Sequence, residues 1–278
     1  MAEKATLIQW SKSNDVKLKC RLDLGRLFDP TTANRFADRY REFLEDKFNK
    51  GIYCHKGNQL FYDSEQLIPP KQKPGRTILL VLGNPASQSV HSGMFFANKD
   101  KGPDHRFWSI IEDLNNLRSD TFEIRPSDNI NQIRKQKMLG PGCDKFFKIG
   151  LCVMLTMPSA AGGKWGGVQG IQRLLGRKAF RKVLEAESKR VTRIAKTFIK
   201  NGGAVIVFQK DAWETLRCER SAEYSIEKAK SNELVGRLKG APDIPLYGVP
   251  PTRLSVPCQK VIGKIADKLQ SRQKTKHP

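Results

Sequence analysis

A chain of 278 residues can bury a substantial hydrophobic core, either as one large domain or as one domain with an appendage. Its 50 lysines and arginines outnumber 28 aspartates and glutamates, and the formal charge of +22 indicates a polyanionic partner, most simply nucleic acid. No apolar run approaches the roughly 18 residues of a membrane-spanning helix, and the N-terminus lacks the apolar centre of a signal peptide, so we expect an intracellular protein with no membrane partner.

The six cysteines and four histidines are scattered along the chain. No two cysteines form a C-x-x-C pair, so the usual spacing of a zinc site or an iron–sulfur cluster is absent from the sequence. We expect reduced thiols, as in most cytosolic proteins, and we expect neither a metal nor another cofactor.

Residues 1–75 are expected to form an N-terminal α+β appendage that ends in a linker. Asp29 provides a helix start, and apolar residues then recur at helical spacing, which predicts an amphipathic helix over about 31–49. The apolar segments around Tyr53 and Tyr62, separated by a turn, predict a β-hairpin. Prolines and basic residues disfavour regular structure at the end of this region, where we place the linker.

The most informative segment is 77–97, TILLVLGNPASQSVHSGMFFA. Its continuous apolar run ILLVL predicts a strand that is covered on both faces in a parallel sheet. The polar turn 83–85 follows with Asn84 at its centre, and open α/β sheets place their ligand chemistry at such strand ends. Phe95 and Phe96 come next, and an aromatic face is the platform that an unstacked base needs. The alternative is an ordinary turn with both phenylalanines in the core.

Helical and strand patterns alternate through the rest of the chain. Helices are expected at 104–114, 179–200, 211–216 and 258–271, with a short helix inside a long loop at 119–148. Buried strands are expected at 149–157, 204–208 and 244–249, and the charged stretch 217–242 is expected to be an exposed excursion. Together with the strand before Asn84, they predict an α/β fold: a three-layer α/β/α sandwich around a four-stranded parallel sheet. This catalytic domain would span residues 76–278.

The loop at 160–167 contains Lys164 and Trp165 among glycines. It is not a phosphate-binding P-loop, because no Ser or Thr follows the lysine and the first glycine is misplaced. Either Lys164 and Trp165 contact a nucleic-acid backbone, or the loop is a tight turn with a packed tryptophan.

Several ordered motifs resemble the uracil-DNA glycosylase superfamily, nearest the branch of thymine-DNA glycosylase and the mismatch-specific uracil-DNA glycosylase. That branch carries a G-x-N-P-G-type turn, a G-x-x-F-A segment, an R-F-W helix start, a G-K-x-A-aromatic segment and a final H-P-S-P-L-S or N-P-S-G-L-S turn. The corresponding segments here are 84–85, 93–97, 106–108, 209–213 and 250–255. The resemblance covers about residues 76–271.

The resemblance implies roles for individual residues. Asn84 corresponds to the residue that positions water at C1′ of the sugar, and an amide in this role suits slow turnover. Phe96 corresponds to the ring that stacks on the flipped base, while main-chain groups near Gly83 and Phe96 read its polar edge. Arg253 and Leu254 would wedge into the duplex. The other base-binding candidates are Pro85, Ala86, His91 and Thr252, and the other DNA-binding candidates are Ser255, Lys210 and Lys164.

Two positions depart from the family pattern. Pro250 stands where many relatives have His or Asn, so the usual donor to the departing base is missing, and Thr252, Arg253 or His91 would replace it. Ala86 stands where the strict uracil enzymes carry a tyrosine, which predicts tolerance for thymine or for a modified cytosine or uracil.

The function expected from the sequence is a monofunctional DNA glycosylase that flips a mismatched, deaminated or 5-modified pyrimidine and hydrolyses its N-glycosidic bond. The product is an abasic site without strand cleavage, because the motifs place no lysine nucleophile. The enzyme would act in base-excision repair or in defence against modified phage DNA, as a monomer on double-stranded DNA with a flipped base or on single-stranded DNA. It would lie with the nucleoid in a prokaryotic cytoplasm or in a eukaryotic nucleus.

Two other classes of function compete with this one. The first is a catalytically silent nucleic-acid binding module that keeps the glycosylase fold, which the proline at position 250 favours. The second is a nucleotide-processing α/β enzyme, which the charge of +22 disfavours because it is excessive for a free nucleotide.

Overall fold

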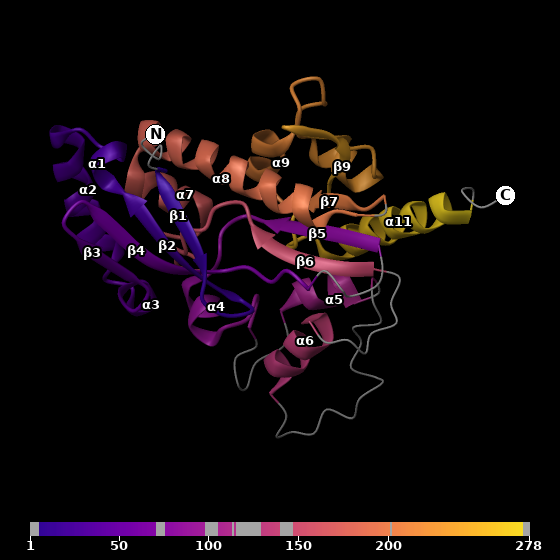
Figure 1. The fold of residues 1–278 in the computed structure, drawn as a ribbon, viewed down its shortest axis with the longest axis horizontal. Helices are drawn as coiled ribbons and strands as arrows, with labels where there is room; N and C mark the ends of the chain where they lie inside the picture. The colour runs from indigo at the N-terminus through magenta and orange to yellow at the C-terminus, as the bar shows by residue number, and fades with distance from the viewer. Residues whose placement is uncertain are drawn as a thin grey trace, which may run out of the picture. The chain divides into compact units, whose positions relative to one another are not determined.

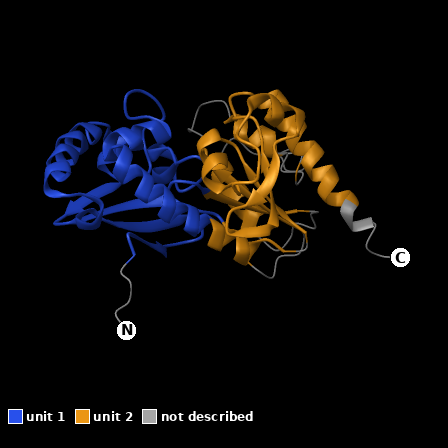
Figure 2. Ribbon diagram, turned by 90° about the horizontal axis from the view of Figure 1, so that it is seen from above, with its two compact units in different colours: residues 1–67, 83–95, 153–191 blue, residues 68–82, 96–152, 192–278 orange. Residues whose placement is uncertain are grey.

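The computed structural model describes residues 6–70, 76–97, 105–112, 114, 129–139, 147–200 and 202–274 (Figure 1). The chain divides into two compact units, which Figure 2 draws in different colours. Unit 1 comprises residues 1–67, 83–95 and 153–191, and unit 2 comprises residues 68–82, 96–152 and 192–278. The N-terminal segment therefore shares a unit with two later segments, and the domain boundary near residue 75 stays a prediction. Residues 71–75 of the expected linker lie outside the described residues.

Unit 1 contains a four-stranded antiparallel sheet in the order β1-β2-β4-β3. Its strands are β1 (Ile8–Lys12), β2 (Lys17–Asp23), β3 (Tyr53–Lys56) and β4 (Gln59–Glu65). The pairing of β3 with β4 confirms the expected hairpin, and Tyr53 lies opposite Tyr62 in it. The sequence reading missed β1 and β2, although β2 alternates inward apolar residues with outward polar ones.

The single helix expected over 31–49 is wrong, because two helices occupy this segment. The first, α2 (Pro30–Phe43), begins with a capping box at Asp29. The second, α3 (Lys47–Lys50), begins at Asp46, whose carboxylate accepts two main-chain N–H groups. An aspartate cap of this kind stabilises a new helix start and so ends the preceding helix.

One hydrophobic core joins the N-terminal segment of unit 1 to residues 153–191. Its buried members include Phe36, Phe43, Tyr62, Leu155 and Ile171. The later segment supplies α7 (Gly167–Leu175), which the sequence did not predict, and the first part of α8 (Arg177–Phe198). A Cβ at Gly170 would lie 2.1 Å from the carbonyl oxygen of Trp165, so α7 needs glycine at this close approach.

Unit 2 is built on a five-stranded sheet in the order β6-β5-β7-β9-β8. Its strands are β5 (Arg76–Leu82), β6 (Phe147–Val153), β7 (Ala204–Val207), β8 (Val235–Leu238) and β9 (Ala241–Gly248). Strands β5, β7 and β9 run parallel, and β8 runs antiparallel to β9. The α/β class is confirmed. The sheet has five strands rather than the expected four, because β8 adds an antiparallel edge strand.

Much of the stretch 217–242 is exposed, as its charge suggested, but the stretch also contains regular structure. It contains α10 (Ile226–Ser231) and β8, and some of its apolar residues are buried, although Val235 is 39% exposed. Those that are at most 1% exposed are Ala229, Leu234 and Leu238. The indole Nε1 of the buried Trp213 donates to the carbonyl of Ala222 at 3.0 Å and holds the start of this stretch. An antiparallel edge strand needs only one apolar face, so a low apolar content hid it.

The expected helices of unit 2 are present, including one inside the stretch 119–148, of which residues 119–128 and 140–146 lie outside the described residues. They are α5 (Arg106–Glu112), α6 (Ile130–Leu139), α9 (Lys210–Leu216) and α11 (Ser255–Lys274). Helices α5 and α11 pack against each other. Among the described residues, no helix combines the length and apolar character needed to cross a membrane.

Candidate functional site

In unit 1, the turn that follows β5 is bonded to the loop that follows β6. The Leu155 N–H donates to the Gly83 carbonyl at 3.0 Å, and the Ser159 N–H donates to the Pro85 carbonyl at 3.1 Å. The Ser87 N–H returns a bond to the Ser159 carbonyl at 2.9 Å. These bonds fix the main chain on both sides of position 84, so a side chain there has a defined direction.

The side chain of Asn84 crosses this junction and is half-buried. Its Nδ2 donates to Ser159 Oγ at 2.9 Å and to the Met157 carbonyl at 3.2 Å. A carbonyl can only accept, so the nitrogen must face Met157 and the amide orientation is fixed. No described residue donates to Asn84 Oδ1, which leaves this oxygen as a preset acceptor for water.

A buried polar network holds the loop to which Asn84 is bonded. The Thr156 N–H donates to Glu187 Oε1 at 2.8 Å, and Arg190 Nε donates to Glu187 Oε2 at 2.6 Å. Both ionic side chains come from α8 and are 0% and 5% exposed. Tyr62 from β4 reaches Thr156 Oγ1 at 3.0 Å, and burial raises the pKa of this tyrosine well above 10. This network therefore holds in place the loop that contains Met157 and Ser159.

Neither Glu187 nor Arg190 was predicted from the sequence as a candidate site residue. A signal was present, because both residues fall on the helix face that carries Val183 and Val191. A glutamate and an arginine three residues apart on an apolar helix face indicate a buried ion pair.

The helix after Asn84, α4 (Ser87–Ser92), is tied to the N-terminal segment at both ends. Ser87 Oγ donates to the buried Asn49 Oδ1, and Asn49 Nδ2 donates to the Phe43 carbonyl at 3.0 Å. At the other end, His91 Nε2 lies 3.0 Å from the Phe48 carbonyl, which requires a proton on that nitrogen. His91, expected to face a base, therefore has a partner in α3.

In unit 2, Phe96 has an unusual backbone and a stacked ring. Its φ of +46° lies in the left-handed region, which non-glycine residues rarely adopt and which marks functional sites when the surroundings hold it. The half-buried ring stacks on His105, with centroids 4.3 Å apart and planes at 17°, and lies 4.4 Å from the Phe107 ring. Trp108 Nε1 donates to the Phe96 carbonyl at 3.1 Å and holds the backbone in place.

His105 was not singled out from the sequence, yet it completes this aromatic group. The Phe107 N–H donates to His105 Nδ1 at 3.1 Å, so the imidazole caps the start of α5 and keeps Nδ1 unprotonated. The imidazole lies nearly parallel to the Phe96 ring and covers a face of it in the structure. Phe95, in contrast, is fully buried and belongs to the core.

In unit 2, the final turn, residues 250–255, is hydrogen-bonded to the start of α5. Arg106 Nη1 donates to the Arg253 carbonyl at 3.2 Å, and the Leu254 N–H donates to the Pro251 carbonyl at 2.8 Å. Arg253 points to solvent, whereas Thr252, Leu254 and Ser255 are partly buried. Val256 follows and is 76% exposed, a second apolar side chain at this turn that the sequence reading missed. Pro250, at the position of the family donor, is buried.

The two lysine candidates differ in their surroundings. Lys164 forms an ion pair with Glu42 and lies 5.1 Å from the ring of Trp165, which packs edge-on against Phe43 at 5.9 Å. The alternative of a turn with a packed tryptophan therefore describes this loop. Lys210 is exposed at the start of α9.

Unit 1 thus carries Asn84 and its neighbours, and unit 2 carries Phe96 and the final turn. Within the described ranges, no group of three or more His, Cys, Asp or Glu side chains is placed to hold a metal ion. No protein-family model and no curated protein matches the chain.

Proposed function

We propose that the protein is a monofunctional DNA glycosylase of the uracil-DNA glycosylase superfamily, nearest the thymine-DNA glycosylase and mismatch-specific branch. It flips a mismatched, deaminated or 5-modified pyrimidine and hydrolyses its N-glycosidic bond. The same proposal includes a three-layer α/β/α arrangement for the domain at 76–278. The observation that carries it is Asn84, whose amide is anchored through nitrogen and leaves its oxygen as an acceptor.

Cleavage of the glycosidic bond requires such a residue only to orient the attacking water. Cleavage of an N-glycosidic bond passes through an oxocarbenium-like sugar, which an oriented water can attack at C1′. Asn84 Oδ1 accepts a hydrogen bond from that water and aims its lone pair. An amide cannot remove the proton, so turnover is slow and favours bases that leave easily.

In this proposal the flipped base stacks on Phe96 in place of His105, whose imidazole occupies a face of the ring in the structure. The left-handed backbone of Phe96 and the bond from Trp108 support a ring held rigidly in one orientation. The carbonyl of Phe96 already accepts one bond, so it retains one lone pair for the polar edge of the base. Ala86 leaves room beside the pyrimidine 5-position, which supports substrates with a 5-substituent.

The final turn contacts the duplex in this proposal. Arg253 is exposed and faces phosphates, and Leu254 fills the space that the base vacates. The exposed Val256 adds apolar surface next to this wedge. Repair of damaged DNA and defence against modified phage DNA both fit these contacts.

The test is base release from a panel of duplexes that contain uracil, thymine opposite guanine, or a 5-modified cytosine or uracil. Hot alkali converts abasic sites to strand breaks, which are counted on a gel. We expect breaks for at least one 5-substituted base, and Asn84→Ala to lower the rate by roughly 100-fold. Asn34→Ala, an exposed asparagine on α2, is the matched control and keeps full activity.

A catalytically silent DNA-binding module is the second candidate, and the buried Pro250 favours it. Tight binding without any abasic product over the whole panel would contradict the glycosylase and support the module. Release of uracil alone would overturn the proposed tolerance for 5-substituents.

A further inference from the structure

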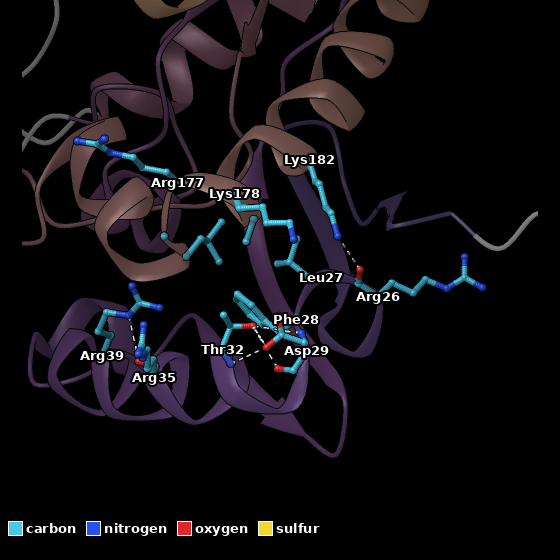
Figure 3. Close-up of a pocket in the computed structure, with 13 residues that line it drawn as sticks. Arg26, Leu27, Phe28, Asp29, Thr32, Arg35, Arg39, Arg177, Lys178 and Lys182 are labelled. Atoms are coloured by element: carbon cyan, nitrogen blue, oxygen red, sulfur yellow. Dashed lines mark hydrogen bonds between the residues drawn. The ribbon is translucent and has the colours of Figure 1, made fainter.

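A cavity of about 380 Å³ lies in unit 1, away from Asn84 and its hydrogen-bond partners. It is lined by α1 (Leu24–Leu27), the start of α2 and the junction of α7 with α8 (Figure 3). Leu27, Phe28 and Leu175 give it an apolar floor. Its cationic residues are Arg26, Arg35, Arg39, Arg177, Lys178 and Lys182.

The charge in this cavity is strongly one-sided. Asp29 is the single carboxylate in the lining, and it already accepts from the Thr32 N–H at 2.8 Å as the cap of α2. Hydrogen bonds from Thr32 lower the pKa of Asp29, so this carboxylate stays ionised. One carboxylate among so many cationic side chains leaves a large positive potential in the cavity.

The side chains that face the space come from two walls. In Figure 3, Lys178 and Lys182 extend from α8 on one side, Arg35 and Arg39 lie on α2 on the other, and Arg26 and Arg177 extend outward. Burial lowers the pKa of Arg39, and the nearby charge of Arg35 lowers it further. Like charges held this close indicate a site that an anion would stabilise.

Main-chain carbonyls position these side chains without neutralising them. Arg39 Nη1 donates to the Arg173 carbonyl at 3.1 Å, and Lys182 Nζ donates to the Arg26 carbonyl at 3.4 Å. Over the described ranges, no carboxylate lies within ion-pair distance of the four inward-facing cations. Apart from the attraction between Lys178 and Asp29 at longer range, their charge is available to a ligand.

The N-terminus of the long helix α8 adds positive potential to the cavity. Its 22 residues begin at Arg177, directly after Gly176, whose φ of +80° turns the chain into the cavity wall. Free N–H groups at a helix start bind phosphate oxygens.

We propose that this cavity binds a phosphodiester group of a nucleic-acid strand, with the attached nucleoside against Leu27 and Phe28. A nucleotide unit has the combination that the lining matches, an anion on one side and a flat apolar base on the other. The volume is that of a small-molecule site, and the charge of +22 favours a polyanion over an isolated anion. The inference is independent of glycosylase activity, because it concerns binding alone.

The test uses the full-length protein and an unmodified, fluorescein-labelled single-stranded DNA, with affinity measured by anisotropy over a range of salt concentrations. The cavity variant is Lys178→Gln with Lys182→Gln, and the control is Lys12→Gln with Lys19→Gln, which removes the same charge from exposed strand positions of unit 1. We expect the cavity variant to bind roughly tenfold more weakly at 0.1 M salt, and its salt slope to fall by about 0.7 to 1.4.

The control should change the affinity by no more than about twofold, since scattered surface charges contribute little individually. Equal affinities and equal slopes for the two variants would overturn the proposal. A variant that loses binding of thymidine 5′-phosphate but keeps the DNA affinity would also overturn it, in favour of a free-nucleotide site. Circular dichroism of both variants checks that the fold is intact.

Discussion

At the scale of single residues, Phe96 shows what a sequence pattern leaves out. The motif predicts an aromatic ring at this position, but it cannot predict a left-handed backbone, because phenylalanine has no local preference for it. The conformation is imposed by contacts with His105, Phe107 and Trp108. A cost of about 1 kcal/mol or more for such a backbone indicates that the ring position matters.

Replacing Phe96 tests whether the flat ring is what matters. Phe96→Leu keeps an apolar side chain but removes stacking, which is worth about 1–3 kcal/mol per base, so base release should fall by roughly 5- to 150-fold. Phe96→Tyr keeps the ring and should retain most activity. Equal rates for the two variants in the alkali assay would contradict a stacking role.

The sequence could predict the position of Asn84, but not the orientation of its side chain. The position of Asn84 followed from a buried apolar run that stops at a polar turn. Its orientation did not, because it depends on Met157 and Ser159, which are far away in the sequence. The partner that His91 finds in α3 is equally non-local.

At the scale of secondary-structure elements, α8 has a structural task beyond packing. Its Glu187–Arg190 pair holds the loop that in turn holds Asn84. Glu187→Gln leaves Arg190 buried without a counter-charge, and we expect a loss of about 3–5 kcal/mol in the free energy of unfolding. Urea unfolding of the purified protein, followed by circular dichroism, measures it.

A double variant separates charge from shape in this network. Replacing both residues, by Glu187→Leu and Arg190→Met, removes the uncompensated charge and should cost less than the single change. A single variant that is as stable as the double variant would contradict this account.

The solvent exposure of a strand decided whether its sequence pattern predicted it. Strands covered on both faces, such as β5 and β7, form continuous apolar runs and were predicted. Strands with one solvated face, such as β2 and β8, interleave lysine or arginine with apolar residues and were missed. The helix expected over 31–49 failed at Asp46, because a cap has the same composition as a polar helix face.

At the scale of the whole molecule, stability should depend on pH through Glu65. This residue of β4 is 4% exposed, its Oε2 has no hydrogen-bond partner among the described residues, and burial raises its pKa to about 8. The folded state therefore keeps a proton that the unfolded state releases above its ordinary pKa of 4.5. Stability should fall by up to about 1.4 kcal/mol per pH unit between roughly pH 5 and 8, and level off above.

Glu65→Gln removes this titration and should flatten the fall of stability in that range. Glu45→Gln, an exposed glutamate of the same unit, is the control and should leave the pH dependence unchanged. Urea unfolding at a series of pH values gives the comparison. Parallel curves for the wild type and Glu65→Gln would contradict the assignment.

The composition of unit 1 has a consequence for biosynthesis. The first 67 residues leave the ribosome before residues 153–191, which complete their core, have been translated. At ordinary translation rates the delay is on the order of 10 s, during which Phe36 and Phe43 lack their later partners. The nascent chain therefore presents an apolar surface that a chaperone would shield. For the same reason, a shortened chain that lacks the first 67 residues would expose the part of the unit 1 core that residues 153–191 supply.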